Sequence, residues 1–265
     1  MNAWSLGRRL AAMCAVVVLI PASASAADIR VMISAGFYGV YAELAERFEA
    51  ATGHRLITTR GPSMGDSPEA IPARLSRGEA ADVVIMDGGA ADDLARRGLV
   101  RAGSTVALAL SQIGMVVPAG VITPDISSVE AFRRTLLAAE SIGHSDSASG
   151  TYLSAILFAE LGIEDQVAGK TRRVRGPPSG EPVAAVVARR EVAIGFQQVS
   201  ELIHVPGVTF VGAIPAELQP GNSFAGAVTT DAQQPDAALA LLRFLASPEW
   251  DSTLVEAGLT PPERP

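Results

Sequence analysis

The chain has 265 residues, of which 48% are hydrophobic and 18% are charged, so it is a globular chain large enough for one big domain or two lobes. Its formal net charge of −7 argues against nucleic acid or an anionic membrane surface as a partner, because both attract basic proteins. Low aromatic content with many alanines, valines and glycines suits an α/β protein with closely packed helices and sheets.

The first 26 residues have the features of a secretory signal peptide. Two arginines precede an apolar run at residues 10–20, which is too short to span a bilayer, and Ala-Ser-Ala at 24–26 has the form of a cleavage site. The only cysteine, Cys14, lies inside this segment, so a mature chain starting near Ala27 has no thiol for a disulfide, a metal site or catalysis. Without the two arginines, 19 basic residues face 28 acidic ones, a net charge of −9. We therefore expect a periplasmic protein that keeps no membrane anchor after cleavage.

Strands and helices alternate along the rest of the chain. Short apolar or alternating runs predict strands, and apolar residues three and four positions apart predict helices. Strands are expected at residues 29–34, 55–59, 81–86, 113–117, 172–175, 192–197, 208–211 and 225–228. Helices are expected at residues 37–51, 68–77, 90–97, 129–139, 181–190, 236–245 and 250–257, and from residue 151 onward. This alternation predicts an α/β fold with mostly parallel sheets flanked by helices.

The stretch of residues 141–161 carries a signal for anion binding. A short apolar segment ends at Ile142, small polar residues follow, and an apolar-periodic helix begins at Thr151. The free backbone N–H groups and the dipole at such a helix start attract an anion. An ordinary helix cap uses the same residue types, so the functional interpretation depends on the pattern recurring elsewhere in the chain. The expected ligand contacts in this stretch are Ser147, Ser149, Gly150 and Thr151.

The same pattern recurs after the first two expected strands. Ser34 and Gly36 follow the first strand and lead into a helix, and Ser63 lies in the Gly- and Pro-containing loop after the second. Arg60, at the edge of that loop, carries a planar guanidinium that matches a carboxylate. Met64 beside it is expected mainly to pack, although it could wall a small cleft. The carboxyl ends of parallel strands meet at one edge of a sheet, so these residues are expected to share one crevice.

The order of these features resembles the periplasmic solute-binding proteins of the molybdate-binding type. The resemblance implies a type II two-lobed periplasmic-binding-protein fold that closes on its ligand like a hinged clamp. It implies a first lobe formed by residues 27–110 with 199–265 and a second lobe formed by residues 111–198. It also implies Ser34 and Ser63 as ligand donors from the first lobe, and the turn at residues 147–151 as the contribution of the second.

One departure from that family concerns the ligand. Molybdate binders usually carry a tyrosine near the returning hinge, where this chain has Gln197 and Gln198. A glutamine amide both donates and accepts, so it suits a ligand with mixed polar groups better than a bare tetrahedral oxyanion. Together with Arg60, the two amides favour an organic acid.

Several phrases are similar to those of a narrower branch, the periplasmic aconitate isomerases. They lie at residues 31–34 (Val-Met-Ile-Ser), 61–65 (Gly-Pro-Ser-Met-Gly), 71–79, 145–150 (Ser-Asp-Ser-Ala-Ser-Gly) and 194–202. This resemblance implies interconversion of trans- and cis-aconitate by an allylic proton shift, without an added cofactor.

Such a shift needs a base within about 3 Å of the acidic C–H group and donors that hold the developing negative charge. The candidates for the base are His144, Asp146 and Glu181. Each has a structural alternative, because a lone histidine beside a strand end often serves packing, Asp146 could cap a helix, and the helix dipole alone explains Glu181. There is no metal motif, since His54, His144 and His204 are too scattered along the sequence to suggest a zinc site.

Three classes of function stay open at this point. The first is an isomerase acting on a small polycarboxylate, and the second is a non-catalytic carrier that hands molybdate, another small oxyanion or an organic acid to an inner-membrane ABC transporter. The third is a sensor or adaptor lobe without an exchanging ligand. The first two share a small anionic ligand, and none of the three calls for a metal, a cofactor or nucleic acid.

Overall fold

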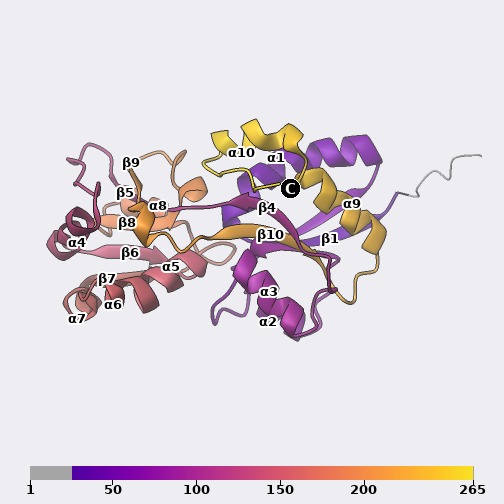
Figure 1. Cartoon of the computed structure of the whole chain (residues 1–265), viewed down its shortest axis with the longest axis horizontal. Helices are drawn as coiled ribbons and strands as arrows, with labels where there is room; N and C mark the ends of the chain where they lie inside the picture. Colours follow the sequence, from indigo (N-terminus) through magenta and orange to yellow (C-terminus); the bar gives the residue numbers. More distant parts are fainter. Residues whose placement is uncertain (1–25, 265) are drawn as a thin grey trace, which may run out of the picture.

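Two five-stranded sheets lie side by side in the computed structural model, which describes residues 26–264 (Figure 1). The first sheet has the strand order β2-β1-β3-β10-β4, and the second has the order β7-β6-β8-β5-β9. Helices cover the faces of both sheets, as expected for a two-lobed α/β protein. The expected signal peptide lies, apart from Ala26, outside the described residues.

The strands of the first sheet are β1 (Asp28–Ile33), β2 (Arg55–Arg60), β3 (Val83–Asp87), β4 (Val106–Leu110) and β10 (Ser223–Val228). Those of the second are β5 (Ile113–Pro118), β6 (Ile142–Ser145), β7 (Thr171–Val174), β8 (Ile194–Gln198) and β9 (Val208–Ala213). The sequence did not predict β4, since its Val-Ala-Leu-Ala-Leu run carries residues that favour a helix as readily as a strand.

The helices are α1 (Ala35–Thr52), α2 (Ile71–Ser76), α3 (Gly88–Arg96), α4 (Val129–Ala138), α5 (Ala148–Tyr152), α6 (Phe158–Glu160), α7 (Glu164–Val167), α8 (Val183–Ala188), α9 (Pro235–Leu245) and α10 (Asp251–Glu256). A π-helical turn at Leu153–Leu157 joins α5 to α6 without a break. In the described part of the chain, no helix combines the length and the apolar character that a membrane crossing requires.

One strand in each sheet runs against its neighbours. β10 is antiparallel to β3 and β4, and β5 is antiparallel to β8 and β9, whereas the other pairs are parallel. Each reversed strand is the first one that the chain makes after crossing between the sheets. The sheets are therefore mostly parallel, and this mixed arrangement is the predicted type II fold.

The chain crosses between the sheets at two places, residues 111–112 and residues 214–222. The second crossing lies later than the expected boundary at residue 199, because β9 pairs with β5 and so belongs to the second sheet. The periodicity of residues 208–211 predicts the strand, but its partner depends on a pairing with a segment about ninety residues earlier, which local sequence does not reveal.

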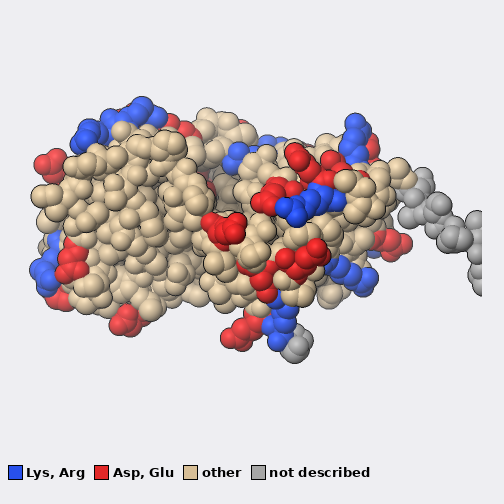
Figure 2. Space-filling model, turned by 90° about the horizontal axis from the view of Figure 1, so that it is seen from above, with Lys and Arg blue, Asp and Glu red and all other residues tan. Residues whose placement is uncertain are grey.

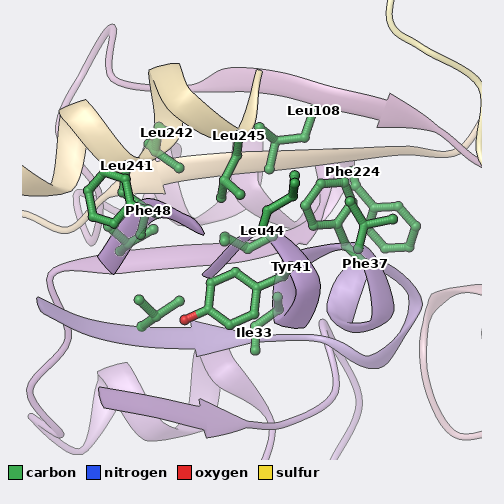
Figure 3. Packing of buried hydrophobic residues seen from close by; sticks show 14 of the residues in the cluster. Ile33, Phe37, Tyr41, Leu44, Phe48, Leu108, Phe224, Leu241, Leu242 and Leu245 are labelled. Atoms are coloured by element: carbon green, nitrogen blue, oxygen red, sulfur yellow. The ribbon is translucent and has the colours of Figure 1, made fainter. Parts of the chain in front are cut away.

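The apolar face of α1 packs into the core of the first lobe (Figure 3). Phe37, Tyr41, Leu44 and Phe48 are almost completely buried, and they recur at the three- and four-residue spacing of one helix face. They pack among strand residues and the apolar residues of α9. This packing fixes the axis of α1, so its N-terminus is held firmly at the cleft between the lobes.

The core of the second lobe holds the α5–α6 helix in the same way. Leu153, Leu157 and Phe158 are buried in a cluster with Phe132 and Phe196, whose rings meet edge to face at 5.8 Å. The N-terminus of α5 is therefore also set by packing rather than by the loop that precedes it.

Asp82, directly before β3, connects its own segment to β1 and to residues 233–234 in the first lobe. Its side chain is 1% exposed and accepts the backbone N–H groups of Arg30 at 2.8 Å, Gln233 at 2.6 Å and Gln234 at 2.9 Å. In Asp82→Ala these donors lose their acceptor, and we expect the free energy of unfolding to fall by about 3 kcal/mol in urea titrations. Asp92→Ala, at an exposed position on α3, is the matched control. Equal stability of the two variants would contradict this account.

Candidate functional site

A cavity lies between the two lobes at the carboxyl ends of their parallel strands. It contains about 520 Å³ of space, part of it open to solvent. Its lining combines residues of the first lobe (Ser34, Ala35, Gly36, Arg60, Gly61, Pro62, Ser63, Asp87 and Phe224) with residues of the second (Ser145, Asp146, Ser147, Ala148, Ser149, Gly176, Pro177, Gln197 and Gln198) and Glu201 between them. All three polar turns that the sequence singled out thus meet at one place.

Two buried polar atoms in this cavity have no hydrogen-bond partner within the described part of the chain, Ser34 Oγ and Arg60 Nε. Ser34 stands at the N-cap of α1 but does not bond to the helix, and the Arg60 guanidinium lies 4.2 Å from the centre of the Tyr38 ring. Because buried polar atoms are nearly always paired, these two donors mark a place for an acceptor from outside the chain. An anion meets both requirements.

The N-terminus of α5 faces the same cavity. Ser147, its N-cap, does not bond to the helix either, and its Oγ instead accepts the backbone N–H of Ser63 at 3.3 Å across the cleft. The N–H group of Gly150 donates to Ser145 Oγ at 3.2 Å. The N–H groups of Ala148 and Ser149 have no partner within the helix, so they add donors and a positive dipole end. Two helix starts, one from each lobe, therefore converge on the cavity.

Gly150 permits the close approach of α5 to β6. A Cβ atom at this position would lie 1.8 Å from the carbonyl oxygen of Ser145 and 2.7 Å from His144 Nδ1. Gly150 is thus buried beneath the cavity rather than on its lining, and we attribute to it a packing role. Thr151 likewise lies outside the lining, exposed on the helix, because α5 begins at Ala148, three residues earlier than expected.

His144 is not part of the cavity, in contrast to its expected role as a base. The strand β6 continues past Ile142 to Ser145, so the His144 side chain is held in the sheet, where it is 4% exposed and its Nδ1 lies 2.9 Å from the Ser145 carbonyl oxygen. Burial lowers the pKa of His144, because desolvation disfavours the charged ring. The strand end was misplaced because β6 is completed by pairing with β7, a non-local contact.

Glu181 and Met64 also lie away from the cavity lining. Glu181 forms two hydrogen bonds with Arg189, at 2.6 and 2.7 Å, on the surface of the second lobe, and this guanidinium lowers the pKa of Glu181. α8 begins only at Val183, so Glu181 precedes the helix that it was expected to open. Met64 packs against the core of the first lobe beside α3, which agrees with its expected packing role.

Asp146 is the sequence-predicted base that does line the cavity. It is 7% exposed, and its Oδ1 accepts the backbone N–H of Gly176 at 3.0 Å. Asp87 is a second buried acid on the lining; its Oδ1 accepts the N–H of Ala90 at 3.0 Å, and burial raises the pKa of Asp87. Both carboxyl groups therefore already bond to backbone groups that shape the cavity.

Gln197 and Gln198 line the cavity, but their amides are largely engaged by the protein. The amide oxygen of Gln197 accepts the Val183 N–H at 3.0 Å, and its nitrogen donates to Glu201 Oε1 at 2.6 Å. The amide oxygen of Gln198 accepts the hydroxyl of Ser111 at 2.6 Å. The main task of Gln197 is therefore to orient Glu201.

Glu201 is the residue that sequence reasoning missed. It ends the 3-10 turn Val199–Glu201 that directly follows β8, and its carboxyl group is enclosed between the lobes. Desolvation raises the pKa of Glu201 to about 7, although the hydrogen bond from Gln197 and the charge of Arg60 lower it. The sequence feature that could have identified Glu201 is its position, because this acid follows directly after the carboxyl end of a buried strand. A carboxyl group that titrates near neutrality in a cavity is suited to proton transfer.

The lobes contact each other beside the cavity. The loop at residues 61–70 reaches the second lobe through the ion pair of Asp66 with Arg173 at 2.5 Å and the hydrogen bond of Ser179 Oγ to Glu69 Oε2 at 2.6 Å. The Arg173 guanidinium lowers the pKa of Asp66. These contacts connect the two lobes beside the cavity.

The face seen in Figure 2 shows no strongly basic patch. Acidic and basic side chains are scattered over the face seen in Figure 2 and form no continuous basic surface. Among residues 26–264, no group of three or more His, Cys, Asp or Glu side chains is placed to hold a metal ion.

Comparisons with known proteins agree with this geometry. Residues 29–260 match the family described as bacterial extracellular solute-binding protein. The chain is 46% identical over 231 residues to a protein named aconitate isomerase from a Pseudomonas species, and the alignment covers 87% of each chain.

Solved structures share the fold. The periplasmic molybdate-binding protein of Azotobacter vinelandii has a TM-score of 0.70 at 19% identity, covering 89% of this chain and 100% of that one. The substrate-binding domain of a putative molybdenum ABC transporter from Clostridium difficile has a TM-score of 0.64 at 16% identity, covering 90% and 100%. At these identities the likeness concerns the fold alone.

The raised pKa of Glu201 predicts a pH-dependent stability. Between its ordinary value of 4.5 and about 7, the folded protein holds a proton on Glu201 that the unfolded chain releases, so rising pH favours unfolding in this window. Urea titrations at several pH values should show that the stability of the wild type falls relative to Glu201→Gln from about pH 4.5 to 7. A constant difference between the two proteins across this window would contradict the assignment.

Proposed function

The chain belongs to the bacterial extracellular solute-binding protein family, and from this premise we propose that it is an aconitate isomerase. It would convert trans- into cis-aconitate by moving a proton between two carbons that each bear a carboxylate. The 46% identity to the Pseudomonas protein of that name, over 87% of both chains, supports this assignment.

The geometric observation that carries the proposal is the combination of unpaired donors and carboxyl groups in one cavity between the lobes. Arg60 Nε and Ser34 Oγ await an anionic acceptor, whereas Glu201, Asp87 and Asp146 stand on the same lining. Carboxylates repel an anion, so a site built only to carry one gains nothing from them. A site that moves a proton on a polycarboxylate requires both kinds of group.

The donors would also stabilise the reaction. Removing a proton beside a carboxylate places additional negative charge on that carboxylate, and fixed cations or N–H groups lower the energy of this state. Arg60 and the two helix N-termini are held in place by packing, so they need not reorganise as the charge develops. The contacts of Asp66 and Glu69 with the second lobe hold the two lobes together beside these donors.

We propose as ligand contacts the sequence-predicted residues that line the cavity: Ser34, Gly36, Arg60, Ser63, Asp146, Ser147, Ser149, Gln197 and Gln198. Family membership and the expected signal peptide support a periplasmic location.

A second candidate is a non-catalytic carrier of a small anion that docks to an inner-membrane ABC transporter. The fold similarity to the Clostridium difficile substrate-binding domain favours it, since that domain belongs to a putative molybdenum ABC transporter. Under this alternative the protein binds its ligand and returns it unchanged.

Purified protein incubated with trans-aconitate separates the two candidates. We expect cis-aconitate to accumulate to a constant ratio, followed by chromatography, and we expect either isomer to raise the melting temperature. Molybdate is the comparison ligand. Stabilisation by molybdate alone, without turnover of aconitate, would favour the carrier and contradict the isomerase.

Arg60→Gln tests the anion-binding part of the site. Hydrogen bonds to charged groups contribute about 1.5–3 kcal/mol, so we expect KM for trans-aconitate to rise by about 10- to 150-fold. Arg96→Gln, at an exposed position of α3, is the matched control. An unchanged KM in Arg60→Gln would show that the guanidinium does not contact the substrate.

A further inference from the structure

Glu201 lies at the junction of two hollows. It lines the cavity between the lobes, and together with Arg60 and Ser200 it also lines an adjoining hollow of about 420 Å³ that is partly open to solvent. Ala35, Arg60, Pro177 and Glu201 are the residues shared by the two linings, and Glu201 is the only carboxyl group among these four. A proton on this side chain therefore has access both to a bound ligand and to solvent.

We propose that Glu201 is the general base that carries the allylic proton, and that it exchanges this proton with solvent through the adjoining hollow. The proposal rests on the proposed isomerase function and names the group that performs its chemical step. It assigns the role to a residue of the turn after β8 rather than to His144, Asp146 or Glu181.

The orientation of the carboxyl group is fixed by Gln197. Because the amide oxygen of Gln197 accepts the Val183 N–H, its NH₂ group must point the other way, toward Glu201 Oε1 at 2.6 Å. This bond stabilises the ionised carboxylate that a base needs, whereas enclosure between the lobes opposes ionisation. The balance leaves a group that can both take and return a proton near neutral pH.

The other charged or titratable groups considered for the site are placed differently from Glu201. Arg60, from the end of β2, faces it and can hold the charge that develops on the substrate. Asp146 Oδ1 accepts the Gly176 N–H and Asp87 Oδ1 accepts the Ala90 N–H, and neither acid lines the adjoining hollow that Glu201 reaches. His144 is buried next to Gly150 and does not line the cavity. Glu181 is paired with Arg189 on the surface.

The step balances without a further reactant. The C–H bond of the substrate methylene breaks, its proton moves to the Glu201 carboxylate, and the electron pair forms a new double bond to the central carbon. The π pair of the old double bond takes a proton from the Glu201 carboxylic acid at the former vinylic carbon. The carboxylate is regenerated, and nothing is oxidised or reduced.

Glu201→Gln tests this role, because it keeps the size of the side chain but cannot take up a proton. We expect kcat to fall by about 10²- to 10⁴-fold, while the thermal shift with trans-aconitate is retained, which shows that the variant folds and binds. Glu201→Asp keeps the carboxyl group and should retain measurable turnover. Glu43→Gln, an exposed site on α1, is the matched control and should keep the wild-type rate.

Turnover in D₂O adds a readout that a purely structural role would not change. In the wild type the aconitate formed should carry deuterium, detected by mass spectrometry, and Glu201→Gln should lose deuterium uptake together with isomerisation. Wild-type isomerisation without deuterium uptake would overturn the exchange route, and an active Glu201→Gln would overturn the base assignment alone. A wild type that binds aconitate without turnover would overturn the proposed function itself.

Discussion

The site depends on the burial of two helices whose N-termini point into one cleft. The apolar face of α1 and the apolar residues of the α5–α6 helix are buried in separate cores, so the position of each helix start is determined by the packing of the helix behind it. The positions of Ser34 and Ser147 at the cleft therefore follow from the packing of the two helices. Ser34 and Ser147 can leave their helices uncapped because packing, and not the cap, holds these helices in place.

The cavity presents hydrogen-bond donors together with carboxyl groups. The chain carries a net charge of −7, yet its cleft offers a guanidinium, free hydroxyls and helix starts to an anion. The same enclosure that strengthens these donors disfavours ionisation of any acid beside them. The raised pKa of Glu201 is one effect of this burial, because desolvation disfavours the charged carboxylate.

Local sequence could predict the alternation of strands and helices and the polar turns after them, because these depend on residue spacing and on glycine and serine chemistry. Ser34, Arg60 and Ser63, which these turns carry, all lie on the lining of the cavity. Local sequence did not predict features that depend on contacts between residues far apart in the chain. The end of β6, and with it the burial of His144, is set by pairing with β7, and the titration of Glu201 is set by enclosure from both lobes.

The order of strands in the first sheet bears on how the protein assembles. β10 lies between β3 and β4, although about 110 residues of chain separate it from β4. The second sheet draws all its strands from residues 113–213, so it can assemble before the C-terminal part of the chain is made. The first sheet stays split into two pieces until residue 228 has been synthesised, which keeps the lobe that carries Ser34 and Arg60 incomplete until translation is almost finished.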